Sequence, residues 1–165
     1  MKYAGIIEND IAAAPGICVS FFTQGCPHHC PGCQNPETWD FNAGKDFNNE
    51  VLFKIIKALK ANGVERKLCI MGGEPLCKEN LILTEMVIAT VRDSLPQTEI
   101  YVWTGYTFPE LEKQKNDNSH IQYILTHIDC LIDGKYIESE RDVTLEMRGS
   151  KNQNIIYFSN KGEYY

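Results

Sequence analysis

Three of the seven cysteines lie within eight consecutive residues, at Cys26, Cys30 and Cys33. On an α-helix this spacing would place the three sulfur atoms on one face, as in a buried apolar stripe. Pro31 excludes a helix here, because proline lacks the backbone N–H of a helical turn and its ring clashes with the carbonyl group four residues earlier. The neighbouring glycines and prolines also favour a loop. In a reducing compartment, three thiols that converge on such a loop indicate a metal centre.

Two kinds of metal centre are compatible with this spacing. A structural zinc ion takes four ligands, usually as two short pairs that are separated in the sequence, and no second pair is evident. A Cys3His zinc site could use His28 or His29, although both histidines are expected to be solvated loop residues. Iron–sulfur clusters are held by thiolates at short spacings, and three cysteines can leave one iron of a four-iron cluster open to a ligand that is not protein. The cluster is the favoured interpretation, and zinc is its alternative.

A buried strand is predicted immediately before the cysteine loop. Residues 17–23 form a dense β-branched and aromatic run that ends near Gly25, which is typical of a buried parallel strand. Further strands are predicted at residues 67–71 and 99–103, and a fourth over residues 128–135, which runs into a polar turn. Ligands of α/β folds bind at the C-terminal ends of such strands. The strand at residues 17–23 therefore delivers the cysteines to the ligand-binding edge of the sheet.

The remaining elements support this arrangement. Residues 1–15 are predicted to be an irregular entry or edge segment. A 3.6-residue apolar period predicts a helix over residues 51–59, and Asn80 is expected to cap a second helix. Residues 108–125 should form two short helical pieces, and a last apolar run covers residues 155–158.

Residues 35–41 continue from the cysteine loop without periodicity. We expect this segment to cover the metal centre and exclude water. Trp39 and Phe41 within it could equally be ordinary packing residues.

A second candidate motif follows the strand at residues 67–71. Gly72 and Gly73 let a ligand approach the backbone closely, and the carboxylate of Glu74 can accept hydrogen bonds from a cationic amine. A plain turn is the alternative, because turns use glycine freely.

Candidate residues also follow the other predicted strands. Thr104 and Tyr106 come directly after residues 99–103, although a structural role is an alternative for both. Asp133 ends the fourth strand and therefore faces the ligand-binding edge. The loop at residues 148–153 either is solvated or binds a ligand or a partner.

Length and composition limit the fold and the partners. The 165 residues, 43% of them apolar, suffice for one domain over residues 1–165. A closed eight-unit α/β barrel needs roughly 250 residues, so an incomplete α/β barrel of mostly parallel strands is the largest that fits. The net charge of −6 and the absence of a basic cluster argue against nucleic-acid binding. There is no secretory pattern and no apolar run of about 20 residues, so a cytoplasmic protein without a membrane partner is expected.

The C-x3-C-x2-C spacing resembles the signature of the radical S-adenosylmethionine (SAM) superfamily. The resemblance implies a [4Fe-4S] cluster held by Cys26, Cys30 and Cys33, with the fourth iron bound by the amino and carboxylate groups of SAM. It also implies that Gly72, Gly73 and Glu74 meet the SAM amino group and that the backbone of Gly32, Cys33 and Gln34 borders SAM. Gly32 stands where many members carry an aromatic residue that borders the adenine.

The order of motifs along nearly the whole chain resembles the activating enzymes of the anaerobic, class III ribonucleoside-triphosphate reductases. The matching stretches are residues 25–33, 35 with 38–39, 72–76, 102–106, 131–135, 148–150 and 152–153. The resemblance implies a radical SAM enzyme that forms a glycyl radical on the reductase, with flavodoxin or ferredoxin as electron donor. The family often has Asn-Gly-Pro-Gly followed by arginine where this chain has Ala13-Ala14-Pro15-Gly16 and Cys18. A radical SAM enzyme that acts on another glycyl-radical enzyme or on a small molecule is the alternative.

Overall fold

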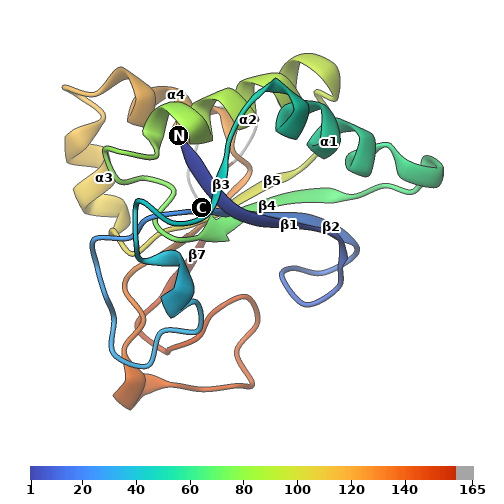
Figure 1. The fold of residues 1–165 in the computed structure, drawn as a ribbon. Helices are drawn as coiled ribbons and strands as arrows, with labels where there is room; N and C mark the ends of the chain where they lie inside the picture. The colour runs from blue at the N-terminus through green and yellow to red at the C-terminus, as the bar shows by residue number, and fades with distance from the viewer. Residues whose placement is uncertain (159–165) are drawn as a thin grey trace.

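The described residues, 1–158 of the computed structural model, form a mixed sheet of seven strands with four α-helices (Figure 1). The strand order is β3-β1-β2-β4-β5-β6-β7. The strands are β1 (Lys2–Asp10), β2 (Cys18–Thr23), β3 (Lys45–Asp46), β4 (Lys67–Gly72), β5 (Ile100–Trp103), β6 (Cys130–Asp133) and β7 (Asn154–Tyr157). The helices are α1 (Asn49–Leu59), α2 (Leu81–Ser94), α3 (Phe108–Gln114) and α4 (Ser119–His127). The chain therefore has the mixed α/β class that the sequence predicts.

The four central strands, β2, β4, β5 and β6, run parallel. Phe21, Ile70, Val102 and Leu131 lie side by side in these successive strands, so the apolar runs recognised in the sequence form one continuous layer. The pairings of β1 with β2, β1 with β3 and β6 with β7 are antiparallel. The expectation of mostly parallel strands therefore holds for the centre of the sheet but not for its two sides.

The N-terminal segment differs from its prediction. The sequence predicts an irregular entry or edge segment at residues 1–15, but β1 is a nine-residue strand that pairs with both β2 and β3. Its residues are half-buried or exposed, so it carries no buried apolar run that would reveal a strand. Irregular backbone begins only at residue 11 and extends to residue 17.

Helices α1, α2 and α4 lie on the same side of the sheet, and the long loops over residues 24–44 and 134–153 lie on the other side (Figure 1). The Asn48 side chain caps α1 by accepting bonds from the N–H groups of Glu50 and Val51, at 3.0 and 3.3 Å. The predicted helix over residues 51–59 is confirmed, as is the break that separates α3 from α4. Within the described residues, no helix combines the length and apolar character that crossing a membrane requires.

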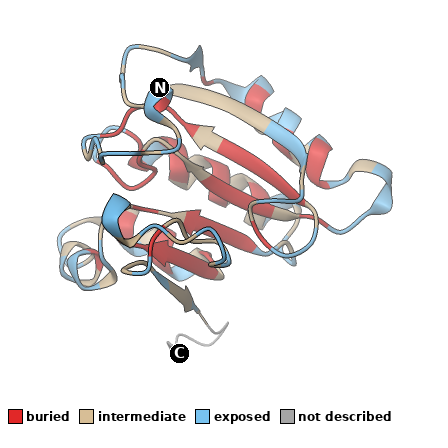
Figure 2. Cartoon of the chain, turned by 90° about the horizontal axis from the view of Figure 1, so that it is seen from below, coloured by how far each residue is buried: buried red, intermediate tan, exposed pale blue. Residues whose placement is uncertain are grey.

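The central strands are buried on both faces (Figure 2). The larger core lies between the sheet and the helices and contains Phe21 and Leu131, both fully buried. A smaller core on the opposite face contains Cys18, Cys69 and Cys130, each with no exposed area. These three cysteines act as small apolar residues inside the sheet. On the face of the sheet without helices, the centres of the strands are covered by this small core. Only the ends of the strands are left to line a binding site.

Candidate functional site

A cavity of about 350 Å³ lies at the C-terminal ends of the parallel strands. Cys26, Cys30 and Cys33 line it from the loop after β2, Gly73 lines it from the end of β4, and Gly105 lines it after β5. Parts of the long segment after β6 close the opposite wall. The strand ends therefore surround one cavity, as the sequence predicts.

The predicted site residues divide into two groups by position. Those that line the cavity are Cys26, Cys30, Cys33, Gln34, Gly72, Gly73, Glu74 and Thr104. Gly32, Tyr106 and Asp133 are not among its lining residues. Gly32 has a φ of +74°, and a Cβ there would lie 2.7 Å from a side-chain oxygen of Glu138. The local backbone therefore requires glycine where many superfamily members carry an aromatic residue.

The start of the cysteine loop is fixed by backbone contacts. The Gly25 N–H donates to the Thr38 carbonyl at 2.7 Å, and the Gly25 carbonyl accepts bonds from the Glu74 N–H at 2.8 Å and from Asn80 Nδ2 at 3.1 Å. A Cβ on Gly25 would overlap the ring of Phe41, so Phe41 is a packing residue. Asn80 occupies the N-cap position of α2, but its side chain makes no capping bond. The amide instead ties the loop to the segment after β4.

The three thiols and their surroundings fit an iron–sulfur cluster. Burial raises the pKa of the Cys26 and Cys30 thiols, so a metal centre bound there would have to displace a proton from each thiol. The Cys33 sulfur accepts a bond from the Asn35 N–H at 3.4 Å. Trp39 lines the same cavity, and its buried Nε1 has no hydrogen-bond partner within the described residues. Hydrogen bonds to the sulfur atoms tune such clusters, so an unpaired N–H donor on a residue that lines the same cavity as the three cysteines fits this group.

A single zinc ion fits the arrangement less well. Within residues 1–158, no three His, Cys, Asp or Glu side chains are placed to hold one metal ion. The His28 ring contacts Glu74, and the His29 ring stacks on Trp39 with 4.7 Å between the ring centroids. Ligands of a four-iron cluster bind different iron atoms, so they surround a volume and do not converge on one point. The cysteine-lined cavity therefore favours a cluster.

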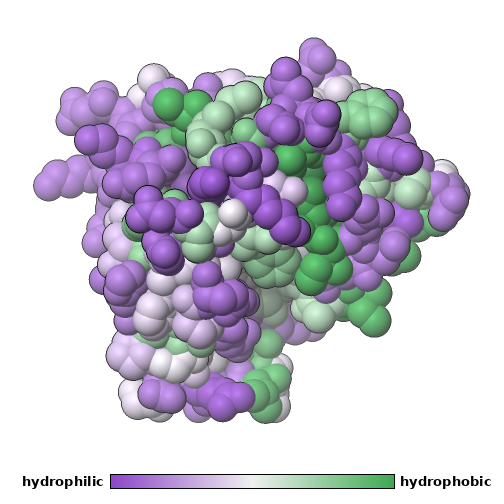
Figure 3. All heavy atoms as spheres, viewed as in Figure 1, coloured by the Kyte–Doolittle hydropathy of each residue, from purple (hydrophilic) through white to green (hydrophobic). Residues whose placement is uncertain are grey.

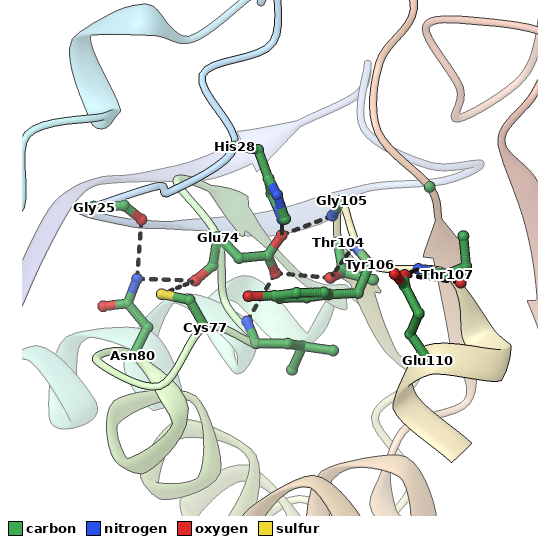
Figure 4. A network of polar contacts seen from close by, with 12 residues as sticks. Gly25, His28, Glu74, Cys77, Asn80, Thr104, Gly105, Tyr106, Thr107 and Glu110 are labelled. Carbon is green, nitrogen blue, oxygen red and sulfur yellow. Dashed lines mark hydrogen bonds and ion pairs between the residues drawn. The ribbon is translucent and has the colours of Figure 1, made fainter. Parts of the chain in front are cut away.

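Glu74 is the centre of a buried polar network (Figure 4). Its Oε1 accepts bonds from the Thr104 hydroxyl at 2.7 Å and from the Leu76 N–H at 2.9 Å. Its Oε2 accepts a bond from the Gly105 N–H and contacts His28 Nε2, both at 2.7 Å. The sequence predicts a solvated His28, but its side chain is only 8% exposed. That prediction is wrong because a buried carboxylate needs a donor on every side, and the cysteine loop supplies one of them.

Three further candidate residues support the site through contacts within the protein. The Thr104 hydroxyl donates to Glu74, and the Tyr106 ring packs edge-on against His28 at 4.8 Å. Burial raises the pKa of Tyr106 to about 12, so its hydroxyl stays protonated. Asp133 is 2% exposed and accepts one bond from the first turn of α3 at 2.7 Å and two from the start of β7, at 3.1 and 2.9 Å. Asp133 therefore joins α3 to β7 and is turned away from the cavity.

Two cations line the cavity on the wall that follows β6. Lys135 comes directly after the β6 turn, and Arg148 lies on the long loop before β7. The loop is ordered by Gln153, whose side chain accepts a bond from the Gly149 N–H at 2.8 Å and whose carbonyl accepts one from Arg148 Nη1 at 3.3 Å. None of the ion pairs among residues 1–158 involves Lys135 or Arg148. Lys135 lines the cavity but was not predicted from the sequence as a candidate residue, although its place at a predicted strand end was a usable signal.

The other four cysteines are packing residues. Cys18, Cys69 and Cys130 lie inside β2, β4 and β6. Cys77 is also buried, and its thiol contacts the Glu74 carbonyl oxygen at 3.1 Å. Burial raises the pKa of both Cys77 and Cys130 to about 12, which keeps them as neutral thiols.

The chain matches known proteins over most of its length. Residues 12–156 match the family model of a 4Fe-4S single cluster domain. The chain is similar to curated proteins named anaerobic ribonucleoside-triphosphate reductase-activating protein. The relative from Vibrio cholerae is 36% identical over 160 residues, which are 96% of this chain and 99% of the relative. The relative from Pasteurella multocida is 38% identical over the same shares, and that from Escherichia coli K12 is 34% identical over 93% of this chain and 96% of the relative. Since these matches cover nearly all of both chains, the protein belongs to the family of anaerobic ribonucleoside-triphosphate reductase-activating proteins.

Proposed function

We propose that this protein is a radical SAM activating enzyme. It binds a [4Fe-4S] cluster through Cys26, Cys30 and Cys33, cleaves SAM reductively, and generates a glycyl radical on an anaerobic ribonucleoside-triphosphate reductase. The observation that carries the proposal is the cavity in which these three cysteines face the glycine pair at the end of β4. The 4Fe-4S family model supports the cluster, and the names of the relatives support the reductase as the target.

The residues around the cavity suit the methionyl end of SAM, which carries an ammonium group and a carboxylate. Gly72 and Gly73 bring backbone to the cavity wall, where carbonyl groups can accept bonds from the ammonium group. Lys135 and Arg148 bring two cations that suit the carboxylate. Glu74 belongs to the same motif, but four contacts within the protein already engage its carboxylate oxygens.

When bound and reduced by an external electron donor, the cluster would supply the one-electron chemistry that cleaves SAM to methionine and a radical, which would take a hydrogen atom from a glycine Cα of the reductase. The residues of the chain bind SAM, orient it and shield the reaction from water. The backbone of Cys33 and Gln34, with Gly32 preceding them, would border SAM. The side chains of Met71 and Trp103 make part of the cavity wall apolar, which helps to exclude water.

The fold and the surface suit a macromolecular substrate. We interpret the sheet, whose outer strands β3 and β7 are its two edges, as the incomplete α/β barrel of radical SAM enzymes. Ile11 and Val143 are 80% and 82% exposed on the two loops whose neighbouring residues line the cavity. The face in Figure 3 is mostly hydrophilic, with apolar atoms confined to narrow areas. Single exposed apolar side chains such as these are normal on protein surfaces, so the support for a macromolecular substrate is the open side that an incomplete barrel leaves beside the cavity. A flavodoxin or ferredoxin would be the electron donor.

The proposal is tested with anoxically prepared protein reconstituted with iron and sulfide. Addition of a reductant, SAM and the reductase should yield 5′-deoxyadenosine and the electron paramagnetic resonance signal of a glycyl radical on the reductase. Lys135→Ala should weaken SAM binding about tenfold or more without changing the iron content, because it removes a charge-assisted bond. Lys57→Ala, an exposed lysine on α1, is the matched control and should bind SAM normally.

Two outcomes would redirect the proposal. Release of 5′-deoxyadenosine without a radical on the reductase would indicate another glycyl-radical enzyme or a small molecule as the substrate. One zinc ion per chain and no inorganic sulfide in anoxic protein would refute the radical SAM assignment.

A further inference from the structure

His28 links the cysteine loop to the ends of the central strands. It lies between Cys26 and Cys30 in the sequence, and its Nε2 is 2.7 Å from Oε2 of Glu74. The ring packs over Gly105, and Tyr106 meets it edge-on at 4.8 Å. Figure 4 shows the imidazole extending from the loop onto the carboxylate, where the segments after β4 and β5 meet. The ring thus touches groups from two strand ends while its backbone belongs to the cysteine loop.

The contacts of Glu74 leave no acceptor site open for another donor. An ionised carboxylate offers about four acceptor positions. Thr104, Leu76 and Gly105 supply three donors, so His28 completes the set. With the other three contacts all donated to the carboxylate, the contact fits a His28 Nε2 that carries its hydrogen and donates it to Glu74. The Glu74 carboxylate therefore contacts the cysteine loop through the imidazole of His28.

Residues 27–33 meet the segment after β6, where Cys30 interacts with the backbone of Tyr136 and Gly32 lies against Glu138, but they have few connections to the ends of β4 and β5. In the described part of the chain, the His28 contact is the one hydrogen bond that a side chain of this segment makes to the segments after β4 and β5. The backbone of the segment is also unfavourable for a free loop, because His29 has a φ of +48° and Gly32 a φ of +74°. A loop with such dihedral angles needs an external contact to stay in one conformation.

We propose that His28 is a positioning residue, which Glu74 fixes in place so that Cys26 and Cys30 are held toward the cavity before a cluster binds. This inference rests on the proposed cluster site. It assigns Glu74 to the support of the cysteine loop, and it leaves the recognition of the SAM amino group to the backbone of Gly72 and Gly73.

The test measures cluster retention without SAM, so it does not depend on the proposed activity. Wild type and variants are reconstituted anoxically, and iron and sulfide per chain are determined, followed by the rate of iron loss to a chelator. His28→Ala should lose iron about tenfold faster than wild type, in the range typical of residues that orient metal ligands. His28→Gln keeps a donor of similar reach and should stay within about threefold of wild type. His120→Ala is the matched control, because His120 makes the same kind of contact, to Glu85 at 2.7 Å, but does not line the cavity and should retain iron normally.

A substitution at Gly105 disturbs the contact between His28 and Glu74 without changing either residue. A Cβ at this position would lie 2.6 Å from His28 Nε2, and the Gly105 backbone is outside the left-handed region, so alanine is compatible with its φ. Gly105→Ala should therefore displace the imidazole and accelerate iron loss as His28→Ala does. The double variant should be no worse than either single variant, because both changes break one contact.

The outcomes separate this inference from its alternatives. Each variant in the comparison must be folded. A Tm of the apo variant within a few degrees of the wild-type Tm would show this. Equal iron retention in His28→Ala and wild type would overturn the inference. Equal loss in His28→Ala and His28→Gln with no effect of Gly105→Ala would also overturn it, because the imidazole would then be an iron ligand. Absence of a cluster in wild type would refute the proposed function itself.

Discussion

Gly73 marks the closest approach between the end of β4 and the cysteine loop, and its replacement by alanine should damage both stability and cluster binding. A Cβ on Gly73 would overlap the Gly25 carbonyl oxygen and would lie only 3.0 Å from its carbonyl carbon. Ordinary contact begins at 3.4 Å, so the loop backbone must retreat by at least about 0.4 Å, and more at the oxygen. The same oxygen accepts the bonds from Glu74 N–H at 2.8 Å and Asn80 Nδ2 at 3.1 Å.

The magnitude follows from those two hydrogen bonds. The retreat would stretch the bond from Asn80 to about 3.5 Å or beyond and would weaken the one from Glu74. Loss of two bonds to a buried carbonyl costs roughly 1–3 kcal/mol. For a chain of this size, about 2 kcal/mol corresponds to a fall in Tm of roughly 4–8 °C. Because the same oxygen fixes the start of the cysteine loop, Gly73→Ala should also retain less iron after anoxic reconstitution.

Gly5→Ala is the matched control for this prediction. A Cβ on Gly5 would meet no atom within 4 Å, and Gly5 is not among the residues with positive φ. This variant should be as stable as wild type or slightly more stable, because alanine restricts the unfolded chain. Both variants are compared by urea unfolding of the apo protein and by iron per chain. A Gly73→Ala variant with wild-type stability and iron content would refute the close approach, and an equal loss in Gly5→Ala would show a general sensitivity to alanine.

Three further predictions concern residues away from the cysteine loop. Asp133→Ala should lower the free energy of unfolding by roughly 1–3 kcal/mol in urea titrations, because three hydrogen bonds to a buried carboxylate are lost; an unchanged free energy of unfolding would contradict the role as a joint between α3 and β7. The bond from Lys67 lowers the pKa of Glu99, so this carboxylate stabilises the fold above its unfolded pKa of about 4.3, and the contribution is lost as the pH falls through the folded value. Glu99→Gln should therefore lower Tm at pH 7 by less than about 4 °C, and this deficit should shrink as the pH falls through the lowered folded pKa of Glu99; a deficit that persisted in acid would show that the carboxylate is not responsible. Cys69→Ser should leave iron per chain unchanged, since this thiol is fully buried inside β4; loss of iron from a folded variant would contradict the ligand assignment.

Much of the sheet was predictable because buried parallel strands have a strong sequence signal. The runs that became β2, β4, β5 and β6 are dense in β-branched and aromatic residues, and both faces of each strand are covered. By contrast, β1 and β3 are held mainly by pairing with a neighbour, and their residues are half-buried or exposed. A strand whose stability comes from its partner leaves little trace in its own sequence.

Site residues were predictable where the chemistry requires a particular residue type. They were unpredictable where contacts with distant segments decide what the side chain does. The cysteine spacing indicated the metal centre because few other functions need three thiols on a proline-rich loop. Lys135 was missed because a lysine at a strand end is usually solvated, and its place on the cavity wall depends on the folding of the following loop. Asp133 was expected at the cavity from its strand position, yet donors from α3 and β7 turn it inward. Glu74 was found by its motif, but its partners come from segments about 30 and 46 residues away, which no local pattern reveals.

The contacts of the loop also bear on the order of folding and cofactor binding. Fixing the backbone of a free residue costs about 1–2 kcal/mol, so a disordered cysteine loop would have to order many residues when a cluster binds. Here the loop is fixed at Gly25 by three hydrogen bonds and at His28 by the contact with Glu74, and none of these involves a cysteine sulfur. The ordering cost is therefore met by protein contacts when the chain folds. In small zinc modules, by contrast, metal binding itself drives folding. On the proposed ligand assignment, a cluster would therefore bind to a loop that protein contacts at Gly25 and His28 already order.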